Sequence, residues 1–146
     1  MNLKSGLRIM ITMHMNTTVI FDSSVGEDTV EILLVQHGAI TSKASVDFFS
    51  GDSQALLAAG TDLLETASEE WSSVDGIALV VGVERFTAAR LVAVTVNSLG
   101  WSLGIPVRSY SALPTVEKVI QDIAATAVVS VGNAVDPFYT KDPRIS

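Results

Sequence analysis

Three short segments near the start of the chain are rich in apolar and β-branched residues, and turn-forming residues separate them. They cover residues 18–22, 29–36 and 39–47, and their lengths and compositions are typical of strands. Their connections, at residues 25–28 and 37–38, are short and contain glycine. Because strands joined by such short turns must run antiparallel, the pattern predicts a three-stranded meander.

From residue 52 onward the apolar positions recur every three to four residues, which predicts an amphipathic helix. Ser50 or Asp52 is suited to cap the start of this helix, and acidic residues occupy its opposite, solvated side. The apolar positions of this first helix are Leu56, Gly60, Leu63, Leu64, Ala67 and Trp71.

The middle of the chain then alternates between strand and helix patterns. Residues 76–83 are a continuous apolar run, which is typical of a central strand buried on both faces. A second helix is predicted from about residue 86 to 103. Gly104 is suited to a helix C-cap and leads into a short strand at 105–107. Because strand–helix–strand units form right-handed crossovers, we expect these two strands to be parallel.

The order of elements predicts an α/β fold with a mixed sheet, in which three antiparallel strands are followed by a parallel β-α-β unit. A third helix over about residues 114–125 and a last apolar run at 127–131 complete the predicted core. The chain has 146 residues, the length of a single domain, and we assign that domain to residues 15–135. Residues 136–146 are a polar tail, and residues 1–14 are interpreted either as an N-terminal arm or as an artefact of the chosen start site.

The second helix has apolar residues on nearly every side, whereas a helix that packs only on a sheet has one apolar stripe. Small residues at Ala89, Ala93 and Gly100 would let another helix approach closely. Two interpretations stay open: the first and third helices cover this surface within the monomer, or the first two helices form a subunit interface. The apolar residues are Ala88, Ala89, Leu91, Val92, Ala93, Val94, Val96, Leu99, Trp101 and Leu103.

Composition and charge exclude several classes of function. The net charge is −7, and the eight charged residues from Asp47 to Glu84 are all acidic, so the surface would repel nucleic acid. The chain has no cysteine, and its two histidines, His14 and His37, are too few for a histidine metal cluster. The longest uncharged stretch, 91–107, contains polar residues and glycines and does not predict a membrane span. With no signal-peptide pattern, we expect a cytoplasmic protein.

Two loops are candidates for contact with a phosphate. Asp22, Ser23 and Ser24 end the first strand, where backbone N–H groups and hydroxyls can bind an anion, although such residues more often make ordinary turn hydrogen bonds. Gly82 begins the loop before the second helix, but the loop has a single glycine, and Glu84 would repel a phosphate. No Ser–His–Asp arrangement can be assembled from the available residues, so catalysis is unsupported.

Several motifs resemble those of TsaB-type (YeaZ-like) proteins, the dimerisation subunit of the bacterial tRNA threonylcarbamoyladenosine machinery. The segment 19–24 (VIFDSS) resembles that family's opening strand, and 52–57 (DSQALL) resembles the start of its first helix. Shorter matches at 104–107, 111–113 and 137–145 follow in the family's order. The stretch 82–99 follows the family's Gly-Pro-Gly-Ser-Phe-Thr-Gly-Leu-Arg motif and keeps Gly82, Phe86, Thr87, Arg90 and Leu99.

The resemblance implies an actin-like (ASKHA, ribonuclease H-like) domain that is not itself the catalyst, in a short form without most of the family's second domain. The catalytic subunit would be a TsaD-like protein, whose metal-binding His-x-x-x-His is missing from this chain, and a TsaE-like ATPase would complete the complex. The loop at 82–85 reads GVER where the family has Gly-Pro-Gly-Ser, and Asn97 replaces the family's lysine. Asp22, Ser23, Ser24 and Gly82 would therefore be a vestigial phosphate loop, and no cofactor is expected.

The same resemblance implies that the first two helices of each subunit pack together in a four-helix interface. Two alternatives stay open beside a TsaD-like partner: a homodimer that uses the same helices, and a nucleotide-binding or hydrolysing enzyme of the same fold, such as a glycoprotease-like protein. No direct contact of this chain with nucleic acid or membrane is expected. The expected interface residues are Leu56, Gly60, Leu63, Leu64, Ala67, Ala89, Ala93, Val96 and Gly100.

Overall fold

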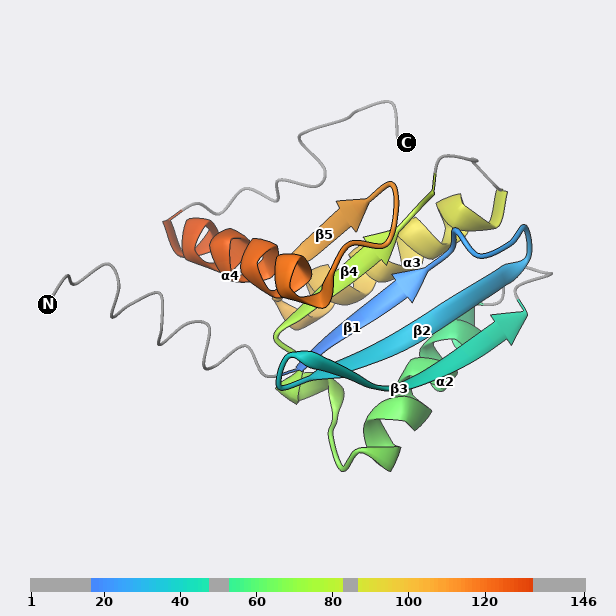
Figure 1. The fold of residues 1–146 in the computed structure, drawn as a ribbon, viewed down its shortest axis with the longest axis horizontal. Coiled ribbons are helices and arrows are strands. Elements are labelled where there is room, and N and C mark those ends of the chain that lie inside the picture. Colours follow the sequence, from blue (N-terminus) through green and yellow to red (C-terminus); the bar gives the residue numbers. More distant parts are fainter. Residues whose placement is uncertain (1–16, 48–52, 83–86, 133–146) are drawn as a thin grey trace, which may run out of the picture.

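The computed structural model describes residues 17–47, 53–82 and 87–132. The predicted arm at 1–14 and the predicted tail at 136–146 lie outside the described residues. Within these ranges the chain forms one five-stranded sheet with helices on both faces (Figure 1). The predicted α/β class is confirmed.

The sheet is mixed, with the strand order β3-β2-β1-β4-β5. Strand β2 pairs antiparallel with β1 and β3, whereas β4 runs parallel to both β1 and β5. The antiparallel meander and the parallel β-α-β unit are therefore both confirmed. The strands are β1 (Thr17–Asp22), β2 (Thr29–Gln36), β3 (Ala39–Asp47), β4 (Gly76–Val80) and β5 (Val107–Tyr110).

The tight turn between β2 and β3 is built from His37 and Gly38. Both residues have positive φ, 52° and 84° respectively, as a two-residue type I′ hairpin turn requires. Glycine adopts this conformation without strain, which explains why the sequence can reverse direction in two residues. His37 is exposed in this turn, and it follows Gln36, which pairs with Thr17 at the opposite end of β1 from Asp22.

The helices cover the two faces of the sheet unequally. Helices α2 (Ser53–Thr66) and α3 (Thr87–Leu103) lie on one face, and α4 (Val116–Gly132) lies on the other (Figure 1). Neighbouring residues of β1 show this division, because Phe21 packs in the core under α2 and α3 while Ile20 packs against α4. Every residue of β1 and β4 is buried, as expected for central strands covered on both faces.

The first helix is shorter than the sequence predicts. It ends at Thr66, and Ser68 then adopts a positive φ of 58°, which turns the chain back on itself. Trp71, predicted as a further residue of this helix, begins the short 3-10 helix η1 (Trp71–Ser73) instead. Its indole Nε1 donates to Thr61 Oγ1 at 2.9 Å. Trp71 therefore packs against α2, although its spacing in the sequence suggested that it belonged to that helix.

The last two elements also differ from their predicted bounds. β5 begins at Val107 and not at residue 105, because the Ile105 N–H still donates to the Gly100 carbonyl at the end of α3. Gly104 has a positive φ of 69°, as expected for the predicted C-cap. The apolar run 127–131 is not a separate element but the continuation of α4.

Polar side chains hold α4 against β5. The Tyr110 hydroxyl donates to Asp122 Oδ2 at 2.8 Å, and Lys118 Nζ lies 3.3 Å from the same oxygen. Burial, followed by the hydrogen bond to Asp122 and its negative charge, raises the pKa of Tyr110 above its ordinary value. Burial also raises the pKa of Asp122, but the hydrogen bonds from Tyr110 and Lys118 outweigh it, so the net shift of that pKa is downward.

We expect this cluster to make stability fall in alkaline solution. Above about pH 10 the unfolded chain loses the Tyr110 proton while the folded chain keeps it, so the unfolded state binds fewer protons and stability decreases as pH rises. The slope from one group reaches at most about 1.4 kcal/mol per pH unit. Urea unfolding from about pH 9 to 11 should show a steeper loss for the native chain than for Tyr110→Phe. Equal slopes for the two chains would contradict this assignment.

Candidate functional site

The outward side of α3 carries large apolar side chains that the monomer leaves exposed. Trp101 is 70% exposed, Val94 is 62% exposed and Leu91 is 44% exposed. With the exposed Ser98, these residues follow the spacing i, i+3, i+7, i+10, which places them along one stripe of the helix. We call the stripe of Leu91, Val94, Ser98 and Trp101 the α3 stripe. Three large apolar side chains along one helix face indicate a contact surface, because single exposed apolar residues would be unremarkable.

The other helices do not cover the α3 stripe. The third helix, α4, packs on the opposite face of the sheet, so it cannot shield α3. Helix α2 approaches α3 on one side, where Ser53 Oγ and Thr95 Oγ1 lie 2.9 Å apart. The first interpretation, in which the first and third helices cover α3 within the monomer, therefore fails for the third helix.

Most of the residues expected at the interface lie inside the monomer. Leu56 and Leu64 on α2 and Val96 on α3 are at most 1% exposed and belong to the core under the sheet. Ala89 and Ala93 are also buried, and Leu63 and Ala67 are partly buried against the same core. The buried side chains attach α2 and α3 to the sheet, whereas Leu63 and Ala67 keep part of their surface exposed.

The two glycines of the expected interface serve contacts within the chain. A Cβ atom at Gly60 would lie 2.9 Å from Trp71 Cζ2, so Gly60 makes room for the indole. A Cβ atom at Gly100 would lie only 2.2 Å from Val107 Cγ2, so Gly100 lets α3 pack closely on β5. The space beside Gly100 is therefore occupied by β5, and its expected role in an interface stays a prediction.

The residues of the predicted phosphate loop are brought together but are already hydrogen-bonded to each other and to β4. The Ser23 N–H and hydroxyl both donate to the Val80 carbonyl, at 2.9 and 2.8 Å. The Ser24 N–H and hydroxyl both donate to Asp22 Oδ1. Asp22 and Ser23 are buried, and Gly82 turns the chain just after β4 with a φ of 83°. The donors that would hold a phosphate therefore stabilise the strand ends instead.

Metal and membrane sites were also sought among the described residues. Ranges 17–47, 53–82 and 87–132 contain no cluster of three or more His, Asp or Glu side chains placed to hold a metal ion. None of the helices in these ranges is long and apolar enough to cross a membrane. His14 lies outside the described residues.

Leu91, Val94 and Trp101 of the α3 stripe are among the apolar residues predicted for this helix, but they are not among the expected interface residues. The expected interface residues were the small residues of the second helix and the periodic apolar residues of the first. A helix that packs on a sheet needs residues of the same kinds on its sheet-facing side. The spacing of 91, 94, 98 and 101 could have identified the stripe, because the residues at 89, 92, 93 and 96 already form a complete sheet-facing side.

Comparison with known proteins places this chain beside two solved structures. No protein-family model matches the sequence, and no curated protein sequence matches it. YeaZ from Pseudomonas aeruginosa matches with a TM-score of 0.57 and 29% identity, over 68% of this chain and 45% of its own. An uncharacterized protein with similarity to the peptidase YeaZ from Pseudomonas aeruginosa matches with a TM-score of 0.58 and 29% identity, over 68% of this chain and 44% of its own.

The sheet order, the helices on both faces and the two matches define a class of protein: an α/β domain in which an antiparallel three-stranded meander lies beside a parallel β-α-β unit. Within that class the chain is YeaZ-like, in sequence as well as in fold. It spans less than half the length of the two YeaZ-type structures that it matches.

Proposed function

We propose that this chain is a non-catalytic partner subunit that binds and activates a TsaD-like threonylcarbamoyltransferase in tRNA N6-threonylcarbamoyladenosine modification. The similarity to YeaZ supports a role of the kind that TsaB-type proteins have. The observation that carries the proposal is the exposed α3 stripe. Tryptophan is one of the residues that most often supply binding energy at protein interfaces, and contiguous exposed apolar side chains mark interaction surfaces. A partner helix laid along Leu91, Val94 and Trp101 would remove this apolar surface from water.

The arrangement of the helices suits such a contact. α2 lies beside α3 on the same face of the sheet, joined to it by the Ser53–Thr95 hydroxyl pair. A partner that brings two helices of its own would complete a four-helix layer on this face. Because the buried sides of α2 and α3 are fixed to the sheet, their outer sides form a rigid surface that need not reorganise on binding.

A role without catalysis agrees with the state of the vestigial phosphate loop. Its hydroxyls and backbone N–H groups are engaged with Val80 and Asp22, so a nucleotide would have to break these bonds before it could bind. In this proposal any ATP chemistry belongs to the TsaD-like subunit and to a TsaE-like ATPase. The protein would act in the cytoplasm, where its tRNA-modifying partners work.

The test is to mix the purified full chain with the TsaD-like protein of the same genome and to measure mass by light scattering. We expect a complex that contains the two partners in equal numbers, with 15.4 kDa from each copy of this chain. The chain alone is the control, because a doubled mass before mixing that Val94→Arg reduces to that of one copy would indicate a homodimer through the same helices. No complex at micromolar concentration would contradict the proposal, and heat of binding between the isolated chain and ATP with magnesium would favour the nucleotide-binding alternative.

A further inference from the structure

The outer edge of β3 is a second surface that no described residue covers. β3 is nine residues long and stands at the end of the sheet, where within the described residues it pairs only with β2. The backbone N–H and C=O groups along the free edge of such a strand can pair with another strand. Proteins block such an edge with proline, a very short strand, lysine or a β-bulge; β3 is long and has no proline, but it carries Lys43 and a bulge near its start.

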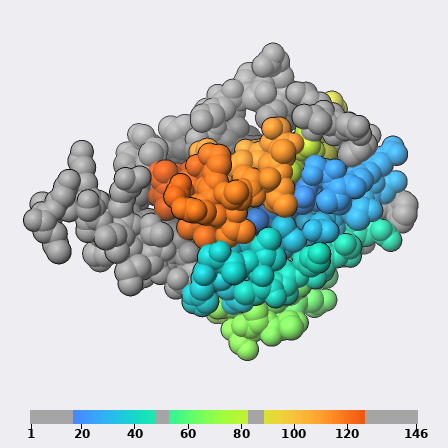
Figure 2. Space-filling view, viewed as in Figure 1, coloured from blue at the N-terminus to red at the C-terminus, as the bar shows by residue number. Residues whose placement is uncertain are grey.

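The charged side chains of β3 lie in one row on one face. The pairing of Leu33 with Lys43 and of Glu31 with Ser45 places Lys43, Ser45 and Asp47 on the face that α4 shares. All three side chains are exposed. Figure 2 views this face and shows the sheet edge formed by β2 and β3 beside α4. α2 packs on the other face of β3, so this row is not covered by it.

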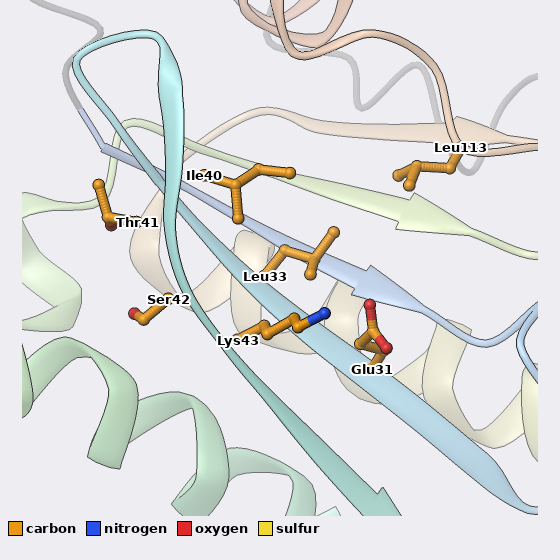
Figure 3. A pocket seen from close by; sticks show the side chains of 7 residues that line it. All are labelled: Glu31, Leu33, Ile40, Thr41, Ser42, Lys43 and Leu113. Atoms are coloured by element: carbon orange, nitrogen blue, oxygen red, sulfur yellow. The ribbon is translucent and has the colours of Figure 1, made fainter.

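Lys43 and Asp47 have no opposite charge bound to them within the described chain. The ion pair of the described residues is that of Lys118 with Asp122. It lies near the opposite edge of the sheet, where Asp122 also accepts a hydrogen bond from Tyr110 of β5. Figure 3 shows the Lys43 side chain pointing toward Glu31, with Leu33 and Ile40 nearby, and Lys43 forms no ion pair with Glu31. The two charges of β3 are therefore available to an added strand.

The row is self-complementary about Ser45. If a second copy of β3 pairs antiparallel with the first and Ser45 meets its own counterpart, Lys43 of each copy lies opposite Asp47 of the other. On the reverse face the same register sets Ala44 opposite Val46. A register centred on Lys43 would instead place two lysines opposite each other, which is destabilising. The sequence of β3 thus favours one register of pairing with itself.

We propose that the free edge of β3 binds the β3 edge of a second copy of this chain, about a two-fold axis at Ser45 that joins the two sheets into one. The irregularity at Leu34 and Val35, where Thr41 bulges out of the pairing, limits this contact to the C-terminal part of β3. A second copy is the occupant because its strand carries the required charges at the required spacing. The contact is separate from the α3 stripe, so both surfaces can be occupied together.

Disulfide trapping tests the register directly. The chain has no cysteine, so Ser45→Cys introduces a single thiol at the proposed two-fold axis. Residues directly opposite in an antiparallel pair have Cα atoms about 4.5–5.5 Å apart, within the range that a disulfide spans. With diamide as the oxidant we expect a covalent dimer on a non-reducing gel. Ala39→Cys, on the same strand and exposed, is the matched control, because in this register the two cysteines lie far apart and should not crosslink.

Charge reversal tests the pairing without a crosslink. Lys43→Glu places like charges opposite each other twice in the dimer and should weaken self-association about tenfold, as measured by sedimentation. Lys43→Glu combined with Asp47→Lys restores the opposite pairs and should restore the dimer.

The crosslinking should persist when Val94→Arg is also present, which separates it from any association through α3. If Ser45→Cys forms no more dimer than Ala39→Cys, the proposal is overturned, and Lys43 serves only to guard the edge. The proposal would also be overturned if Lys43→Glu left self-association unchanged.

Discussion

Val94→Arg should abolish the complex with the TsaD-like partner. Val94 is 62% exposed at the centre of the α3 stripe, so in the isolated chain an arginine there points into water and leaves the fold intact. In the complex the same guanidinium would be buried without a counter-charge, which typically costs about 3–5 kcal/mol. Since 1.4 kcal/mol corresponds to a factor of ten, affinity should fall by at least about a hundredfold. Titration calorimetry against the native chain measures the loss.

The matched control is Ile40→Arg. Ile40 is also apolar and 46% exposed, but it lies on β3, on the far side of the sheet from α3. We expect this variant to bind the TsaD-like partner as the native chain does. If Val94→Arg and Ile40→Arg bind equally well, the α3 stripe is not the contact.

Ala93→Arg would not be an equivalent test. Ala93 follows the same helix but is only 8% exposed and belongs to the core beneath the sheet. An arginine at this position would be forced into the monomer's own interior and would destabilise the chain whether or not a partner is present. Choosing the neighbouring exposed position keeps the effect on binding separate from the effect on folding.

The pairing within the meander and within the β-α-β unit could be predicted from sequence because each strand carries its own evidence, whereas the sequence did not place β4 beside β1. Alternation and short turns define the antiparallel meander, and the uninterrupted apolar run of β4 defines a central parallel strand. Boundaries at helix ends were harder to predict. Trp71 keeps the period of α2 after the chain has turned at Ser68, and Ile105 still bonds to the end of α3. In both places a tertiary contact decides where the element ends. The local hydrophobic pattern gives no information about such a contact.

The candidate site was predicted only in outline. An excess of apolar residues on the second helix was evident, and the structure shows exposed apolar surface there. Which residues form that surface depends on how α3 is rotated about its axis against the sheet. Small residues suggested a close helix contact, but a small residue equally serves a close contact with a strand. Gly100 is such a case, because Val107 of β5 lies against it.

Gly100→Ala should therefore destabilise the isolated chain, in the absence of any partner. Alanine is favoured over glycine within a helix by about 0.8–1.0 kcal/mol, which would stabilise α3 if the site were open. The added Cβ, however, would lie 2.2 Å from Val107 Cγ2, and a β-branched side chain on a strand has little freedom to move aside. Overpacking of this kind costs about 1–3 kcal/mol, so we expect a net loss in urea unfolding.

A double-mutant cycle identifies the cause of that loss. Val107→Ala removes the methyl group that the new Cβ would meet, and by itself it should cost about 1–2 kcal/mol through lost burial. In the Gly100→Ala, Val107→Ala double variant the two changes compensate each other, so the loss should be smaller than the sum of the single losses by about 1 kcal/mol or more. Strict additivity would mean that α3 and β5 do not meet at Gly100. It would then return Gly100 to the set of residues able to face a second helix.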